Sequence, residues 1–186
     1  MDADQPIFYY DLGSPECYLV AETIMAGLPV VPEWEPVLGA SLGIGLEEGV
    51  DRELIERRAG ELGLQPLRWP PAWPPDTREA MLTATYAKRV GRAVAFSLAA
   101  FRQAFAGGRD LGDRDTVLIA AAACEMHPTA VLKGTGLRSV VEALEAAVAR
   151  AAAAGVRSIP AIQVGDVVLD GDRCVEAAAE ALGARA

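Results

Sequence analysis

β-Strand signals lie near both ends of this chain, and helical patterns occupy almost all of the sequence between them. Near the N-terminus, residues 7–10 and 30–34 are short runs that contain aromatic and β-branched side chains. Near the C-terminus, residues 161–164 and 167–169 flank a Gly-Asp pair, which favours a hairpin turn. Strands from the two ends of one domain are expected to share a sheet, so the pattern predicts one sheet with a helical insertion.

A helix is expected between the first two strands. Ser14 and Pro15 are residue types preferred at the N-cap and at the first helical position. The predicted helix runs from Pro15 to about Ala26 and ends at Gly27, because glycine commonly terminates helices. Strand, helix and strand joined by short links form a βαβ unit, which predicts two parallel strands with a right-handed connection.

The middle of the chain is predicted to be all helical. Residues 51–62 carry acids at the front and arginines later, as the helix dipole favours, and a loop rich in Pro and Trp follows at 69–75. The other predicted helices span residues 77–90, 93–106, 113–126, 137–154 and 173–182. This order divides the chain into a sheet-containing domain, residues 1–40 and 137–186, and a helical insertion, residues 41–136.

Composition excludes several functional classes. The net charge of −9 argues against a nucleic-acid partner, which would require clustered Lys and Arg. No run of about 18 apolar residues is present, so no membrane span is expected. The first six residues are acidic and polar, unlike a signal peptide. Three widely spaced cysteines fit neither a disulfide framework nor a metal site, which favours a reduced, cytoplasmic protein.

Two segments far apart in the sequence are expected to meet at one end of the sheet. Residues 14–17 begin the first helix, whose N-terminus can stabilise a thiolate. Residues 158–160 precede the third strand, and a cis bond before Pro160 would turn the adjacent backbone towards a bound sulfur. The thioredoxin active site combines these two features with a Cys-x-x-Cys motif. Here the first cysteine position is Ser14 and the second is Cys17.

A whole-chain resemblance supports this comparison. Residues 8–19 read Phe-Tyr-Tyr-Asp-Leu-Gly-Ser-Pro-Glu-Cys-Tyr-Leu, and further segments agree in order: Trp34–Gly39, the Pro-rich loop before Asp76-Thr77, Gly108–Leu111, Gly155-Val156, Val164–Asp166 and Gly171–Arg173. In these features the chain resembles the DsbA family, and within it 2-hydroxychromene-2-carboxylate isomerases and kappa-class glutathione transferases. The resemblance implies a thioredoxin-like α/β fold with an all-helical insertion between the second strand and the cis-proline strand.

The resemblance also implies a function. The chain is expected to be an isomerase or transferase that uses glutathione or another low-molecular-weight thiol, and not a dithiol disulfide oxidoreductase. Ser14 is the implied catalytic residue, because the corresponding serine hydrogen-bonds the glutathione sulfur. Ile159 and Pro160 would pair with the cysteinyl unit of the cofactor, and Asp172 would hold its γ-glutamyl end.

The implied second substrate is a small electrophile, an aromatic or unsaturated carbonyl compound. Trp69 and Trp73 flank the Pro-rich loop and would supply an apolar wall for it. A homodimer is one expectation for the assembly. No metal, nucleic-acid or membrane partner is expected.

Two alternative functions stay open from the residues alone. The same groove could belong to a redox-inactive binding protein, or Cys17 could serve a single-cysteine thiol enzyme. Ser14 could also act only as an N-cap. Cys17 is expected to be a buried core thiol, and so are Cys124 and Cys174. Glu16 lies beside the expected sulfur site, where its negative charge would raise the pKa of a thiol.

Overall fold

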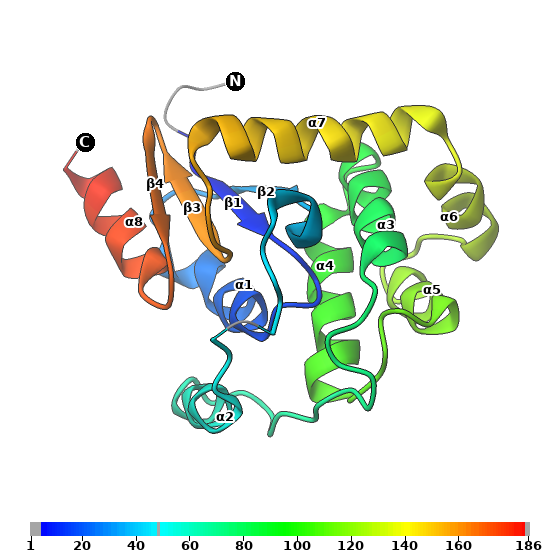
Figure 1. Cartoon of the computed structure of the whole chain (residues 1–186), viewed down its shortest axis with the longest axis horizontal. Helices are drawn as coiled ribbons and strands as arrows, with labels where there is room; N and C mark the ends of the chain where they lie inside the picture. Colours follow the sequence, from blue (N-terminus) through cyan, green and yellow to red (C-terminus); the bar gives the residue numbers. More distant parts are fainter. Residues whose placement is uncertain (1–4, 48, 185–186) are drawn as a thin grey trace.

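Strands from both ends of the chain form one sheet, as the sequence predicts. The computed structural model describes residues 5–47 and 49–184. The strand order is β2-β1-β3-β4, and its members are β1 (Ile7–Tyr10), β2 (Glu33–Pro36), β3 (Ala161–Val164) and β4 (Val167–Asp170). β1 pairs in parallel with β2 and antiparallel with β3, and β3 pairs antiparallel with β4. The sheet therefore brings the end of β1 beside the start of β3, where Tyr9 pairs with Ala161 (Figure 1).

The second strand starts later than the sequence predicts, at Glu33 instead of Val30. Val30 and Val31 are exposed, and the first ladder bond is donated by the Glu33 N–H to the Pro6 carbonyl over 2.8 Å. Pro32 has no N–H to donate, so regular pairing begins after it. Pro36 is tolerated at the end of β2 because β2 is an edge strand.

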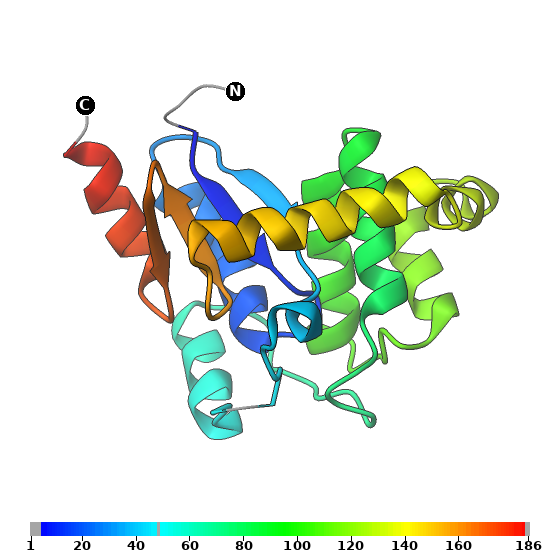
Figure 2. The ribbon, with the colours of Figure 1, turned by 45° about the horizontal axis from the view of Figure 1, so that its top comes forward.

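Helices cover both faces of the sheet. They are α1 (Pro15–Gly27), α2 (Arg52–Glu61), α3 (Arg78–Arg89), α4 (Ala93–Phe101), α5 (Arg114–Ala122), α6 (Pro128–Thr135), α7 (Arg138–Ala154) and α8 (Cys174–Gly183), with a short turn η1 (Gly39–Leu42) and a π-turn η2 (Arg102–Ala106) that extends α4. Phe8 and Tyr10 share a buried cluster with residues of α1 and α8. Tyr9 faces the other way, towards Ala147 and Ala151 of α7, which crosses that face in Figure 2.

The region between α5 and α7 differs from the sequence prediction of one helix over residues 113–126. α5 ends at Ala122, Glu125 adopts a positive φ of 62°, and a separate helix α6 follows. His127 caps α6 because its Nδ1 accepts a hydrogen bond from the Thr129 N–H over 3.2 Å. The alanine run before this break favours helix throughout, so it carries no stop signal, and two glycines in residues 134–136 weaken the helix signal of α6.

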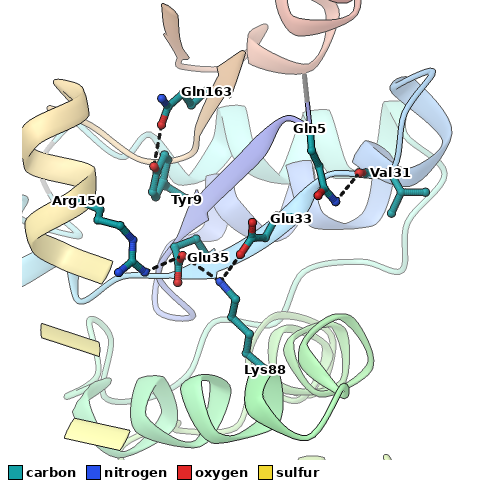
Figure 3. A network of polar contacts seen from close by, with 8 residues as sticks. All are labelled: Gln5, Tyr9, Val31, Glu33, Glu35, Lys88, Arg150 and Gln163. Atoms are coloured by element: carbon teal, nitrogen blue, oxygen red, sulfur yellow. Dashed lines mark hydrogen bonds and ion pairs between the residues drawn. The ribbon is translucent and has the colours of Figure 1, made fainter. Parts of the chain in front are cut away.

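An ion network joins the helical insertion to the sheet (Figure 3). The Lys88 Nζ of α3 lies 2.7 Å from Glu33 and 2.8 Å from Glu35, both on β2. Arg150 of α7 donates to the same Glu35 carboxylate over 3.0 Å. Glu35 has a side chain that is only 8% exposed, so these two cations compensate a nearly buried charge. The network fixes α3 and α7 against the edge strand.

Replacing Gly134 with Ala is expected to lower the free energy of unfolding by about 1–3 kcal/mol, because overpacking a close contact is costly. A Cβ at Gly134 of α6 would lie 2.5 Å from the Tyr86 ring of α3. Gly60→Ala is the matched control: it also lies in a helix, and its Cβ would meet nothing within 4 Å. Urea denaturation measures both variants. Equal effects of the two substitutions would contradict the packing argument.

Candidate functional site

Ser14 occupies the N-cap of α1, as predicted. Its backbone is extended, Pro15 follows in the first turn, and its Oγ accepts a hydrogen bond from the Cys17 N–H over 3.1 Å. The same hydroxyl donates to Glu16 Oε2 over 3.2 Å. Ser14 is only 3% exposed. The hydroxyl is therefore held at the positive end of the helix dipole, where negative charge is stabilised.

Asp11 fixes the turn that carries Ser14, a role that sequence analysis did not assign to it. Its side chain is fully buried. Oδ1 accepts from the Gly13 N–H over 3.0 Å, and Oδ2 accepts from the Gly39 N–H over 2.9 Å and from the Thr77 hydroxyl over 3.2 Å. Burial raises the pKa of the Asp11 carboxyl, although these three hydrogen bonds lower it. One carboxyl group thus joins the β1–α1 turn, η1 and the start of α3.

The predicted cis bond between Ile159 and Pro160 is present. These two residues and Ser14 line one cavity of about 410 Å³, and Asp172 lies on its wall as well. The structure therefore brings together four of the six site residues that the sequence predicts, although they come from opposite ends of the chain. Ile159 lies outside the helices and strands. Its N–H and C=O form no backbone hydrogen bond with another described residue. That short edge is available to an extended ligand.

Charged side chains of both signs surround this cavity. Arg58 of α2 donates to the Asp172 carbonyl over 2.9 Å, and its guanidinium lies 3.5 Å from the Asp172 carboxylate. Arg157, Asp51 and Glu16 complete the charged lining. Glu16 is half-buried, and burial raises the pKa of its carboxyl. A cavity with two guanidinium groups and three carboxyl groups suits a small zwitterion with more than one charged end.

Most of the remaining lining is apolar and comes from a segment that sequence analysis did not single out. Residues 43–47 and 49–50 form a glycine-containing loop after η1, and α2 follows it. They supply the apolar wall of the cavity: Ile44, Leu46, Val50, Leu54 and Ile55. Leu46 also approaches the turn that carries Ser14, since a Cβ on Gly13 would lie 2.7 Å from the Leu46 Cδ1. The three glycines in residues 43–49 were the available sequence signal, because glycine clusters mark loops.

Trp69 and Trp73 do not line this cavity. Their rings form an edge-to-face pair with centroids 5.1 Å apart, and the Arg52 guanidinium lies 4.5 Å from the Trp69 ring centre. The Trp73 Nε1–H donates to the Gly13 carbonyl over 3.1 Å, one residue before Ser14. The ring pair therefore contacts the turn that carries Ser14 from outside the cavity, and a role for either ring in contacting substrate stays a prediction.

Cys17 is a buried thiol. It is 0% exposed, and burial raises its pKa well above the ordinary value, although the Ser14 hydroxyl lowers it. Cys124 and Cys174 are also buried, and all three cysteines of the described residues are free. Burial raises the pKa of Cys174 to about 12. Such thiols are poor nucleophiles at neutral pH. No cluster of three His, Cys, Asp or Glu residues in 5–47 and 49–184 could hold a metal ion.

Replacing Ser14 with Cys is expected to create a disulfide with Cys17 under mild oxidation. The Ser14 hydroxyl already contacts both the backbone N–H and the thiol of Cys17 across the first helical turn. The change produces a Cys-Pro-Glu-Cys sequence, which supplies the second thiol that a disulfide needs. Thiol titration in denaturant should show that the oxidised variant has lost two thiols without dimerising, whereas the wild type keeps all three. A variant that retains every thiol would show that positions 14 and 17 are not in bonding geometry.

Comparison with known proteins assigns the family. Residues 49–183 match the model of the DSBA-like thioredoxin domain. The chain belongs to this family. The matched residues include the cis-proline segment and Asp172, and they begin after Ser14. No curated protein sequence matches the chain.

Solved structures agree with the DsbA-like assignment. A 2-hydroxychromene-2-carboxylate isomerase superposes with a TM-score of 0.82 at 17% identity, over 97% of this chain and 95% of that one. A probable DsbA oxidoreductase from Streptomyces coelicolor gives 0.76 at 19% identity, over 97% and 89%. The cytosolic disulfide reductase DsbM from Pseudomonas aeruginosa, in a structure with GSH, gives 0.70 at 15% identity, over 97% and 96%. At these identities the likeness establishes the DsbA-like thioredoxin fold.

No helix in the described part of this DsbA-like chain is long and apolar enough to cross a bilayer.

Proposed function

We propose that this DsbA-like protein is an enzyme that uses glutathione, or another low-molecular-weight thiol, to isomerise or conjugate a small electrophilic carbonyl compound. The observation that carries the proposal is one cavity that joins the Ser14 hydroxyl, the N-terminus of α1 and the free backbone edge of Ile159. A similar solved structure is a 2-hydroxychromene-2-carboxylate isomerase. A dithiol exchange reaction is disfavoured because Ser14 supplies no thiol beside Cys17.

The residues of the cavity fit a peptide-like thiol. The Ile159 backbone would hold the cysteinyl unit by strand-like pairing. Arg58 and Arg157 would bind its carboxylates, and Asp172 would bind its ammonium group. When bound, the thiol supplies a nucleophilic sulfur. Ser14 would hold that sulfur at the helix N-terminus, and a hydrogen bond to a charged group contributes about 1.5–3 kcal/mol.

The apolar wall of Ile44, Leu46 and Leu54 would accept the electrophile. These side chains line the same cavity as Ser14, so an aromatic or unsaturated ring placed there would lie beside the bound sulfur. They would also reduce the access of water to the reacting atoms. Cys17 is buried and has a raised pKa, which favours catalysis through an added thiol over catalysis through Cys17 itself.

Calorimetric titration with glutathione and with other low-molecular-weight thiols tests the proposal. We expect saturable one-to-one binding of at least one thiol, and thiol-dependent turnover of an unsaturated carbonyl compound. Arg58→Ala is expected to weaken binding about tenfold or more, because it removes a charge-assisted contact. Arg57→Ala is the matched control, since Arg57 is exposed and does not line the cavity. Equal affinities of the two variants would contradict the assigned binding mode, and the absence of binding by every thiol would contradict the function.

A further inference from the structure

The hydrogen bonds of the Ser14 hydroxyl lead to a role for its neighbour Glu16. A serine hydroxyl has one proton to donate and two lone pairs that accept. In the structure, one lone pair accepts from the Cys17 N–H and the single proton is donated to Glu16 Oε2. The same proton is therefore unavailable to a sulfur atom in the cavity. If Ser14 turned its proton towards the sulfur, a charged Glu16 would lose the hydrogen bond from Ser14. It would also face the negative charge of the thiolate.

A proton on Glu16 removes both difficulties. The protonated carboxyl can donate to the second lone pair of Ser14, and Ser14 can then donate to the sulfur while it still accepts from Cys17. Every donor and acceptor of the hydroxyl is satisfied in that arrangement. The assembly of thiolate and carboxyl also carries one negative charge instead of two, which a half-buried site favours. Donation by Ser14 to sulfur is thus coupled to protonation of Glu16.

We propose that Glu16 takes the proton of the bound thiol through Ser14 and then donates it to the electrophile. This inference rests on the proposed function. The S–H proton passes to Ser14 Oγ as the original Ser14 proton passes to Glu16 Oε2. When the sulfur–carbon bond forms at a conjugated double bond, the π electrons move onto the carbonyl oxygen, and the Glu16 proton neutralises that oxygen. Elimination reverses these transfers, and Glu16 recovers the proton as the sulfur–carbon bond breaks.

The surroundings of Glu16 are compatible with this exchange. Arg58 of α2 is the charged group that lowers the pKa of Glu16, and burial outweighs it. Asp51 of the α2 N-cap, Arg157 of the segment before β3 and Asp172 of the segment before α8 line the same cavity. Cys17 follows Glu16 on α1 and its pKa is raised well above the ordinary value, so it does not compete for the proton at neutral pH.

Two reactions separate this role from thiol activation. Glutathione addition to an α,β-unsaturated ketone requires a proton on the enolate, whereas substitution of chloride on 1-chloro-2,4-dinitrobenzene requires none. Glu16→Gln is expected to lower the ratio of addition rate to substitution rate by about 10²-fold, the usual scale of general acid catalysis. The substitution rate itself should change little, since the amide is neutral, as the protonated Glu16 is, and can donate the same hydrogen bond to Ser14. Glu53→Gln, on the exposed first turn of α2, should leave both rates unchanged.

Proton balance gives a readout that does not depend on turnover. The experiment follows thiolate absorbance and proton release together as glutathione binds at neutral pH. The wild type should form thiolate with little proton release, and Glu16→Gln should release about one proton per thiolate formed. If the variant does not fold, the wild type still tests the role, because its addition rate should fall at alkaline pH while its substitution rate does not.

The outcomes distinguish the two proposals. A wild type that binds none of the thiols tested and catalyses the substitution with none of them overturns the proposed function. A wild type that catalyses the substitution, together with a Glu16→Gln variant whose rate ratio and proton release equal those of the wild type, overturns the role of Glu16 alone. A wild type that catalyses substitution but not addition also overturns it.

Discussion

Replacing Ser14 with Ala is expected to lower thiol-dependent turnover by about 10²-fold, because a lost charge-assisted bond of about 3 kcal/mol corresponds to two decades in rate. The same change should cost only about 0.5–2 kcal/mol of stability, the usual cost of losing an N-cap. Steady-state kinetics and urea denaturation measure the two effects separately. A large loss of turnover together with a small loss of stability would distinguish a catalytic hydroxyl from a helix cap.

Asp113→Ala provides the matched control for Ser14→Ala. Asp113 is also an N-cap, with its Oδ1 accepting from the Asp115 N–H over 3.2 Å, but it caps α5 and does not line the cavity. It should cost a similar amount of stability and leave turnover intact. If both variants retain full activity, Ser14 is only a cap.

Replacing Asp11 with Ala is expected to lower the free energy of unfolding by about 3 kcal/mol or more. The change leaves the Gly13 and Gly39 N–H groups without an acceptor in the core, and each unsatisfied buried donor costs about 1–3 kcal/mol. Asp110→Ala is a matched control, because its Oδ1 makes the same type of bond, to the Gly112 N–H over 2.8 Å, at an exposed position. That variant should change stability by about 1 kcal/mol at most.

The pH dependence of the Asp11 contribution has a defined sign. Burial raises the pKa of Asp11 in the folded state, so the folded protein retains a proton at pH values where the unfolded chain has lost it. The contribution of Asp11 to the free energy of unfolding is therefore full below the unfolded pKa and is lost as pH rises through the folded pKa.

If Asp11→Ala and Asp110→Ala lower the free energy of unfolding by the same amount, the three buried hydrogen bonds of Asp11 do not stabilise the turn.

Local signals predicted the elements that form the centre of the site. Ser14-Pro15 predicted the start of α1 because N-cap and N1 preferences act within one turn. The strand runs at both ends predicted one sheet, and the order of segments around Ile159-Pro160 predicted the cis bond through the family resemblance. These features depend on neighbouring residues or on the order of segments along the chain, so a single sequence contains them.

Other features depend on contacts between distant residues and could not be predicted. Asp11 acts through Gly39 and Thr77, and Arg58 pairs with Asp172 across 114 residues of sequence. The cavity wall after η1 becomes recognisable only once the loop is folded against Ser14. Trp69 and Trp73 form a ring pair, and Trp73 donates to the Gly13 carbonyl, contacts that their spacing in the sequence does not specify.

The most direct test of the account is the ionisation state of a bound thiol. Saturating glutathione at neutral pH should give the wild type a thiolate absorbance band that free glutathione lacks under the same conditions, because the α1 N-terminus and Ser14 stabilise the charge. Ser14→Ala, measured at its own saturating concentration, should lose most of that band. A band of equal strength in Ser14→Ala, or a wild type that binds glutathione without forming thiolate, would contradict the central role of Ser14.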